Sequence, residues 1–573
     1  MTLSDAMPRS ARMWRHPRQW MQAPPSLLQS KSRAMPGKTR LAALTILLFS
    51  LAPTQAEIVA PCADSCRVGD LGQGRSCQLW TPATDRWSPG PWDRAGQTHN
   101  LARLHTAWLH RWMMPAGGVM ATQFTDETLS EVLAYSGRRD SAIWTGTYLA
   151  AEALRFMTTG APDADRAMRE TVETLHRWWN IPGDPGYLAR YAAPADSPAP
   201  IQAILSASEP EVHRDVSYEG ALWHWRGNIS RDQYQGVMLG YSLAYEATRS
   251  PAIREFIRQD VVEFIEQLMS SESRAVKLSL NGNPLTTDVR IPYAVFSEAD
   301  APNGIPTLSL TISPFEAAGE GVLFFLPNAA DLVRQVPGFG SFPNLYQATE
   351  AIQLGAMFNV ALQVTEGVPE YAERRQAIAD HYARHADEWL DIAARWRNTN
   401  RCDEGYFGLN IGFMPLYGWT RLETDPTRKG RLQREVLRDA MWAEVKDHKN
   451  VFFAFIYASQ APAEDEIRTV VDVHAEQLVR FPSAPNLALP RDLRDVYPQS
   501  ESCPGISAVA VNVDERVPST FVWERHPWKL QDPGTPNQVY GGVDYLMAYW
   551  MGRHYGFILD DEPGTCLFWK REP

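Results

Sequence analysis

The chain has 573 residues, is 44% hydrophobic and 21% charged, and carries a formal net charge of −12. This composition is typical of a soluble globular protein, and the acidity argues against a nucleic acid or an anionic lipid surface as partner. The length allows roughly two to four average domains or one large architecture. Twenty Trp and twenty Tyr residues predict either an aromatic core or a groove that stacks on flat ligands such as sugar rings.

Residues 1–56 are predicted to be an N-terminal extension followed by a signal peptide. Lys38 and Arg40 precede the apolar run 41–51, and cleavage is expected after Ala56. Because the apolar run is too short to span a bilayer, we expect a periplasmic or extracellular protein without a membrane contact after cleavage. Cleavage would remove eight basic residues and one acid and change the net charge from −12 to −19. If the ligand is a polyanion, the basic groups that bind it would therefore have to be clustered at the binding site.

The cysteines form an even set in a chain that is expected to be exported, which favours disulfides of unknown connectivity. They are Cys62, Cys66, Cys77, Cys402, Cys503 and Cys566. Zinc binding by "CADSC" together with the third cysteine is the alternative, but no His lies at a finger-like spacing. We expect neither a metal nor another cofactor.

An irregular, Cys- and Trp-rich segment, 57–100, precedes a pattern that recurs over 101–560. An apolar helix with Ala, Gly and aromatic residues ends at Thr or Ser, and a more charged helix follows a short turn, as in "YLAAEALRFMTTGAPDADRAMRETVETLHRWW". Helices that are apolar all round are buried, whereas amphipathic helices lie between core and solvent. We therefore expect an all-α fold, an (α/α)6 toroid of helical hairpins, with a C-terminal tail at 561–573. An open solenoid and a multi-helix bundle are the alternatives.

One stretch interrupts the helical pattern. "AVKLSLNGNPLTTDVRIPYAVF" alternates apolar and polar residues around Asn281 and Gly282, which predicts a small inserted β-hairpin within about 274–314. The connections 181–225 and 483–540 are long, and long loops on a rigid scaffold often carry ligand sites.

The segment "RGNISRDQYQGVMLGYSLAYEA" begins as a polar cluster and becomes an apolar helix. Ser230 and Gln233 fit a capping box, and Asp232 would lie in the first turn, where the helix dipole favours a negative charge. Gly236 and Gly240 lie on one face and predict the close approach of a second helix.

The preceding apolar helix offers a counterpart. Aligning "GTYLA" with "GVMLG" places Asp140, in "GRRDSAIWTGTYLA", opposite Ser230. Asp140 and Asp232 would then stand near the starts of two successive inner helices, at the same end of the fold. Two carboxylates in one cavity can divide proton-transfer work between an acid and a base. Alternatively, they are two unrelated acids that each stabilise a helix N-terminus.

Acidic, basic and aromatic residues gather in "EVHRDVSYEGALWHWRGNISRDQ", just before the second of these helices, and in "VWERHPWKLQD". Such groups beside a buried helix are what a polar ligand pocket needs, although a solvated surface loop is the alternative. The predicted substrate-binding residues are Trp144, His213, Asp215, Trp223, His224, Trp225, Arg226, Gln233, Arg525 and His526. Trp144, Trp223 and Trp225 would stack on sugar rings. Arg226 and His224 would orient substrate oxygens, and Arg525 or His526 could bind a carboxylate.

The helical hairpins and the Asp-headed inner helices resemble the six-hairpin glycosidase superfamily, and most of all its unsaturated glucuronyl and rhamnogalacturonyl hydrolases. "SRDQYQGVMLGY" corresponds to the family helix with the catalytic Asp, and "RRDSAIWTG" to the earlier helix. The resemblance implies that Asp232 is the general acid/base, protonating the double bond of an unsaturated uronic acid and activating water. It implies that Asp140 is the partner of Asp232.

We therefore expect an exported, monomeric carbohydrate-active enzyme, a glycoside hydrolase that acts on an oligosaccharide. A polysaccharide lyase and a non-catalytic glycan-binding protein are the alternatives. Both remain open because one fold can host many functions.

Overall fold

The computed structural model describes residues 94–312, 315–398, 402 and 405–558. These residues belong to one compact unit that begins at Ile58. The expectations for the signal peptide, the C-terminal tail and the cysteines at 62, 66, 77 and 566 lie outside the described residues. Within the described residues, every helix is too short or too polar to cross a membrane.

Helices α2 (Ser141–Thr159) and α5 (Arg231–Ala247) pack backbone against backbone, as the glycines of the sequence predict. A Cβ atom on Gly236 would lie 2.4 Å from the carbonyl oxygen of Ile143, and one on Gly240 would lie 2.4 Å from that of Gly146. Only glycine leaves room for such an approach. The N-terminal ends of the two helices are thereby held together.

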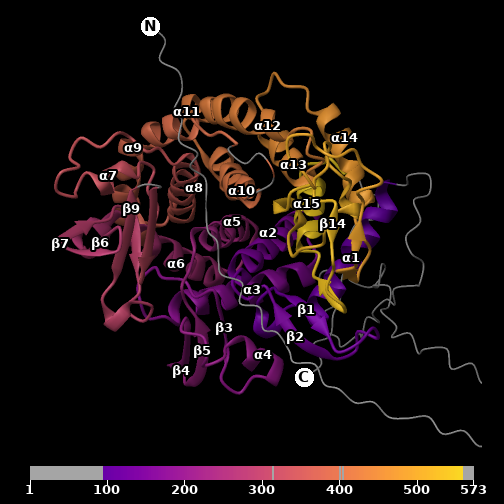
Figure 1. Cartoon of the computed structure of the whole chain (residues 1–573), viewed down its shortest axis with the longest axis horizontal. Helices are drawn as coiled ribbons and strands as arrows, with labels where there is room; N and C mark the ends of the chain where they lie inside the picture. The colour runs from indigo at the N-terminus through magenta and orange to yellow at the C-terminus, as the bar shows by residue number, and fades with distance from the viewer. Residues whose placement is uncertain (1–93, 313–314, 399–401, 403–404, 559–573) are drawn as a thin grey trace, which may run out of the picture. The chain divides into compact units, whose positions relative to one another are not determined.

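Among the described residues, six largely buried helices contact one another in a closed series, and the last contacts the first. In order they are α2, α5, α8 (Ala348–Thr365), α10 (Phe407–Leu422), α13 (Val451–Gln460) and α15 (Val543–His554). Figure 1 shows α2, α5 and α10 in the middle of the view. These helices are buried on nearly all sides because few of their residues are charged.

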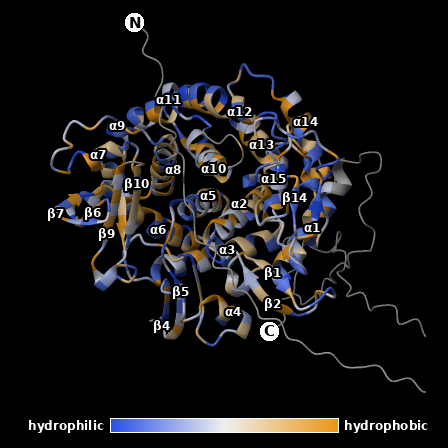
Figure 2. Cartoon of the chain, viewed as in Figure 1, coloured by the Kyte–Doolittle hydropathy of each residue, from blue (hydrophilic) through white to orange (hydrophobic). Residues whose placement is uncertain are grey.

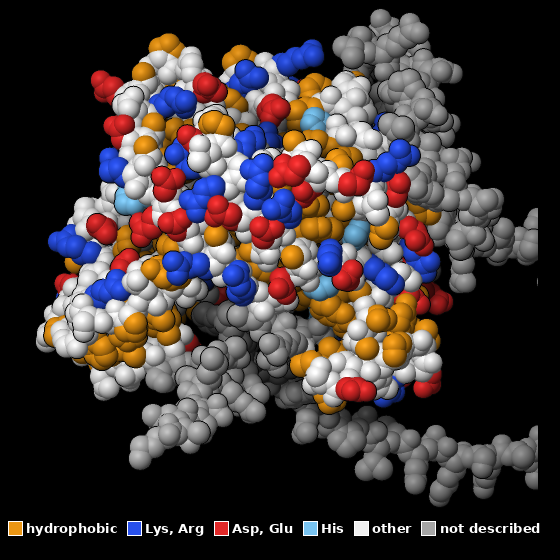
Figure 3. All heavy atoms as spheres, turned by 90° about the horizontal axis from the view of Figure 1, so that it is seen from above, with side chains coloured by type: hydrophobic (Ala, Val, Ile, Leu, Met, Phe, Trp, Pro, Cys, Tyr) orange, Lys and Arg blue, Asp and Glu red, His pale blue; other side chains and the backbone are white. Residues whose placement is uncertain are grey.

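More polar helices flank this series. They are α1 (Arg94–Trp112), α3 (Pro162–Asn180), α6 (Pro251–Ser270), α9 (Ala372–Ala393), α11 (Pro426–Arg431), the π-helical stretch Leu432–Trp442, α12 (Ala443–Val445) and α14 (Arg468–Val479). In Figure 2 the ribbon of α11 is hydrophilic, whereas that of α10 is largely hydrophobic. Basic and acidic side chains are interspersed over the face shown in Figure 3. Among the flanking helices, Arg431 pairs with Glu435.

Shorter helical segments lie in the connections. They are α4 (Ala199–Ile204), α7 (Ala330–Val333) and the 3₁₀ turns Pro115–Gly117, Ser271–Ser273, Pro302–Gly304, Pro369–Tyr371, Val513–Glu515 and Val522–Glu524.

The strands form five sheets among the described residues. One sheet has the strand order β12 (Asn486–Leu487), β15 (Gln538–Tyr540), β1 (Ala121–Phe124), β2 (Val132–Ser136). A second has the order β3 (Tyr191–Pro194), β5 (Ala221–Arg226), β4 (Val212–Tyr218). A third pairs β13 (Arg491–Asp492) with β14 (Gln531–Asp532). The other two are β10 (Phe315–Glu320), β9 (Thr307–Ile312), β6 (Ala275–Leu280), β7 (Asn283–Arg290); and β11 (Val322–Phe324), β8 (Ala294–Phe296). Strands β6 and β9 are parallel, so their sheet is mixed.

The prediction of an all-α toroid with one small β-hairpin is therefore wrong. About half of the described residues are helical and about 16% are in strands, so this part of the chain is a mixed α and β fold. The strands were missed because most are short and lie in connections rich in charged residues. The segment 212–226 was read as a charged loop, yet it is a hairpin turning at Glu219 and Gly220, both with positive φ.

The hairpin at Asn281 and Gly282 is confirmed, and both of these residues have positive φ. It is part of a larger β insertion with a hydrophobic cluster of its own. The cluster includes Val276, Val289, Leu308 and Leu310. The insertion is thus a small packed module, and Figure 1 shows β6, β7 and β9 away from the central helices.

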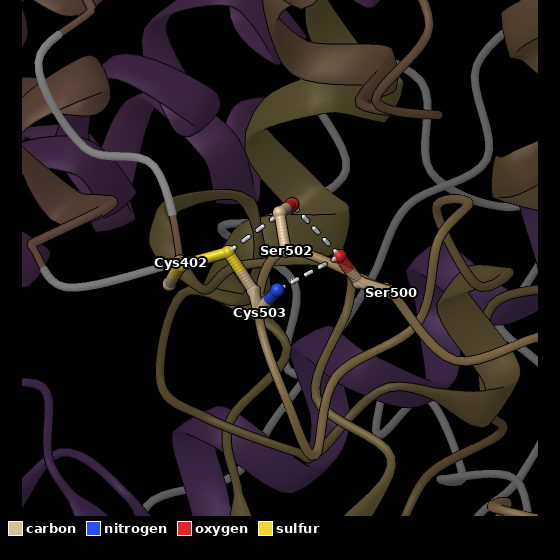
Figure 4. The surroundings of a disulfide bond; sticks show 4 residues. All are labelled: Cys402, Ser500, Ser502 and Cys503. Atoms are coloured by element: carbon tan, nitrogen blue, oxygen red, sulfur yellow. Dashed lines mark hydrogen bonds between the residues drawn. A yellow bond between two sulfur atoms is a disulfide. The ribbon is translucent and has the colours of Figure 1, made fainter.

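A disulfide joins Cys402 to Cys503 across 101 positions of sequence. It links the segment before α10 to a loop of the long connection that precedes α15. The Ser500 hydroxyl accepts a hydrogen bond from the Cys503 backbone N–H, which fixes this loop (Figure 4). One pair of the predicted disulfide set is therefore present.

Candidate active site at the helix N-termini

Asp140 and Asp232 lie at the N-terminal ends of α2 and α5 and are joined by the side chain of Gln233. The Gln233 amide nitrogen, Nε2, donates to Asp232 Oδ2 at 3.1 Å and lies 3.5 Å from Asp140 Oδ1. The sum of these distances, about 6.6 Å, is the upper limit on the separation of the two carboxylate oxygens. The two carboxylates therefore share one site, as the alignment of the two helices predicts.

The predicted capping box at the start of α5 does not form. Ser230 occupies the N-cap position, but its hydroxyl accepts a hydrogen bond from Arg190 at 3.0 Å instead of capping α5. Gln233 is buried, and its Oε1 accepts the backbone N–H of Ile143 at 3.0 Å, in the first turn of α2. The residue read as a local cap of α5 is thus a cap of the neighbouring helix.

The Asp140 carboxyl is crowded by protein but still reached by solvent. Burial raises its pKa, the negative charge of Asp232 raises it further, and Arg190 and Arg525 oppose the shift. The side chain is nevertheless 46% exposed. A side chain with this exposure can be reached by a ligand.

The Arg190 side chain lies beside Asp140. Its guanidinium lies 3.9 Å from Asp140 Oδ1 and donates to the Asn228 carbonyl at 2.6 Å and to the Arg139 carbonyl. The same side chain therefore fixes the residues that precede both helices and supplies positive charge beside Asp140.

The N-terminal turns of other central helices meet the same region. Arg231, which precedes Asp232, pairs with Glu350 in the first turn of α8. Burial raises the pKa of Glu350, and Arg231 opposes this. Helix N-termini carry partial positive charge, so their convergence favours ionised carboxylates.

A third acid, Glu524, completes the group. It ends the 3₁₀ turn Val522–Glu524, and its side chain is 11% exposed. Burial, together with the charges of Asp140 and Asp232, raises its pKa to about 8, against the opposing effects of Arg525 and Asn410. The sequence places Glu524 among other charges in "VWERHPWK", but no local spacing links it to Asp232 and Asp140, which lie 292 and 384 positions earlier.

Of the two basic candidates beside Glu524, Arg525 is at the site. Its guanidinium lies 3.4 Å from Glu524 Oε1, and its side chain is 52% exposed. His526 is mostly buried, and burial first, then the charge of Lys529, lowers its pKa to about 4. A neutral imidazole gives no charge for binding a carboxylate, so Arg525 is the better candidate of the two.

The predicted aromatic candidates are engaged in protein contacts. The Trp144 ring is stacked on Phe521 with centroids 4.8 Å apart, and Trp225 is stacked on His213 at 4.0 Å. Both Trp residues are buried. Arg177 lies over the ring of Trp223 at 4.7 Å. Trp144 lies one helical turn from Asp140, and its backbone N–H donates to the Asp140 carbonyl at 3.3 Å, but each of the three rings is packed against a protein side chain.

The polar candidates of the β4–β5 hairpin also have protein partners. His213 Nε2 lies 2.8 Å from Asp300 Oδ1, and the His224 ring nitrogen Nδ1 accepts the Asp215 backbone N–H at 3.0 Å. Arg226 is buried and forms ion pairs with Glu209 and Glu211. In this structure these residues build the sheet that carries the chain into α5.

Asp300, in the β insertion, contacts the segment that precedes α5. Its carboxylate accepts hydrogen bonds from the Asn228 backbone N–H at 2.6 Å and from the Tyr187 hydroxyl. Gly227 is required there, because a Cβ on it would lie 2.2 Å from Asp300 Oδ1. The segment that leads to Asp232 is therefore fixed from two sides, by Arg190 and by Asp300.

Within the described residues, no group of three or more His, Cys, Asp or Glu side chains is arranged to hold a metal ion. A scan against protein-family models finds no match, and a search of the curated proteins finds none either. The functional interpretation therefore rests on the geometry of the site.

Proposed function

We propose that the chain is a glycoside hydrolase in which Asp232 is the general acid/base and Asp140 its partner. The observation that carries the proposal is the Gln233 bridge, which holds the two carboxylates within about 6.6 Å of each other at the starts of α2 and α5. Hydrolysis of a glycosidic bond needs such a pair, because a proton must be given to the leaving oxygen and another taken from water.

The electrostatics of the pair support this division of work. Burial and the charge of Asp232 raise the pKa of Asp140, so this carboxyl holds a proton more readily than an ordinary Asp. A carboxyl whose pKa is perturbed by burial and by a neighbouring charge is a candidate for proton transfer.

Solvent-exposed cations at the site suit an oligosaccharide with an acidic sugar. Arg525 and Arg139 are about half exposed and lower the pKa of Asp140 from nearby. Guanidinium groups bind carboxylates through paired hydrogen bonds. An unsaturated uronic acid, as the sequence resemblance implies, is therefore the first substrate to examine.

The reaction class is tested by incubating the protein with neutral, uronate-containing and lyase-generated unsaturated oligosaccharides. Falling absorbance of the unsaturated uronate, or new reducing ends without new unsaturation, supports hydrolysis. Rising absorbance of a new conjugated uronate would show a lyase instead. Saturable binding without turnover of any substrate would show a glycan-binding protein, and either outcome overturns the proposal.

A further inference from the structure

Glu524 is held in place by the first turns of two central helices. The Val522 backbone N–H donates to Asp544 Oδ2 at 2.9 Å, and the Trp523 indole N–H donates to the Asp544 carbonyl at 2.9 Å. Asn450, the N-cap of α13, donates through its amide to the Trp523 carbonyl at 2.8 Å. The turn that carries Glu524 is thus fixed to α15 and α13 and does not depend on Glu524 itself.

The surroundings of Glu524 do not make it an ordinary structural ion pair. Its cationic neighbour Arg525 is half exposed, so solvent weakens that interaction. Phe521, three residues before Glu524, stacks on Trp144 of α2 with ring centroids 4.8 Å apart, and the Trp144 backbone N–H donates to the Asp140 carbonyl at 3.3 Å. The turn that carries Glu524 therefore lies beside the start of α2, and the charges of Asp140 and Asp232 act on its carboxyl. A carboxyl placed against two other acids is costly for stability, and such placements are characteristic of catalytic groups.

From this placement we infer that Glu524 is the residue that protonates the leaving group. The inference rests on the function proposed above and assigns its proton donor. The Glu524 carboxyl gives its proton to the glycosidic oxygen as the bond from the anomeric carbon to that oxygen breaks. Asp232 takes a proton from the water whose oxygen bonds to the anomeric carbon. Glu524 leaves the step ionised and Asp232 protonated, and exchange of one proton with solvent restores both.

The electrostatics fit these roles. With a pKa of about 8, Glu524 is largely protonated at neutral pH and can act as an acid. The cause is burial first and the charges of Asp140 and Asp232 second, so the same pair of acids keeps the proton on Glu524.

The test uses leaving groups of different quality on one sugar that the wild-type protein hydrolyses. A 2,4-dinitrophenyl glycoside leaves without protonation, whereas an alkyl glycoside or an oligosaccharide needs an acid. Glu524→Gln should lose about 10²–10⁴-fold in kcat/KM on the alkyl glycoside and less than about tenfold on the dinitrophenyl glycoside. The fall in activity at alkaline pH should also disappear in the variant.

Glu515→Gln is the matched control, because Glu515 ends the preceding 3₁₀ turn and contacts Tyr497 away from the three acids. It should retain wild-type rates on both substrates. Glu524→Asp keeps a carboxyl one methylene shorter, and its intermediate loss with the same dependence on the leaving group supports the inference if Glu524→Gln fails to fold.

Equal losses on the two substrates, or no loss on either, would overturn the role of Glu524. This result leaves the proposed function intact if the wild type hydrolyses the glycosides and Asp232→Asn does not. If the wild type hydrolyses no glycoside or oligosaccharide, the proposed function fails and the inference fails with it.

Discussion

At the scale of single residues, the side chains at the site are poorly placed for stability and well placed for proton transfer. Glu524 is mostly buried beside two acids, and its raised pKa means that the folded state holds a proton that the unfolded chain would release. The unfolded chain therefore binds fewer protons than the folded state at every pH between about 4.5 and about 8. Stability should fall as pH rises through this window.

Replacing Glu524 with Gln removes this contribution. We expect Glu524→Gln to lose less unfolding free energy than the wild type between pH 5 and pH 8, by up to a few kcal/mol, since one pKa unit is about 1.4 kcal/mol. Urea denaturation of both proteins at the two pH values measures the difference. Identical losses would mean that Glu524 is ionised in the folded state throughout this range.

Two of the three acids could be predicted from the sequence, because Asp140 and Asp232 both stand near the starts of matching glycine-bearing helices, Asp140 at the N-cap of α2 and Asp232 in the first turn of α5. Glu524 could not be predicted in this way, because its turn is positioned by tertiary hydrogen bonds to Asp544 and Asn450 that no sequence motif indicates. The role of Gln233 was misread for a similar reason. A capping box is a local pattern, and only tertiary packing shows that Gln233 caps α2 instead.

At the scale of the elements, the contact between α2 and α5 sets the distance between the acids. A Cβ on Gly236 would lie 2.4 Å from the Ile143 backbone oxygen, which no side-chain rotation can relieve. Gly236→Ala should destabilise the protein by about 1–3 kcal/mol and reduce turnover, because α5 must move away from α2. Chemical denaturation and the hydrolysis rate measure the two effects.

Gly408→Ala is the control for Gly236→Ala. Gly408 is also helical, in α10, but a Cβ on it would have no other atom within 4 Å. The substitution should be neutral or stabilise the helix by up to about 1 kcal/mol. Equal stability of the two variants would contradict the account of the α2–α5 contact.

The glycine spacing and the hairpin at Asn281 and Gly282 were predicted because both are local patterns with a strict geometric meaning. The β1–β2 and β3–β5–β4 sheets were not predicted. Their strands are short, and β1 pairs with β15 from the other end of the chain, so no local alternation shows the pairing. This long-range pairing explains why the sheet of β1 and β15 was missed, whereas the β4–β5 hairpin was missed because its charged residues indicated a loop.

At the scale of the whole molecule, the disulfide between Cys402 and Cys503 closes a long loop that contains α10, α13 and α14. A cross-link over about 100 residues restricts the unfolded chain strongly. Replacing both cysteines with Ser should lower the unfolding free energy by about 2–4 kcal/mol. Denaturation of the variant beside the oxidised wild type measures the change, and equal midpoints would show that the cross-link does not stabilise the fold.

The central claim is that Asp232 carries out proton transfer in a site that it shares with Asp140. The most direct measurement is the hydrolysis rate of Asp232→Asn and of the wild type on the same oligosaccharide. Asp165→Asn, in the first turn of the flanking helix α3, is the control. We predict a loss of about 10²–10⁴-fold for Asp232→Asn and wild-type rates for Asp165→Asn. An Asp232→Asn variant that turns over substrate as fast as the wild type would contradict the account.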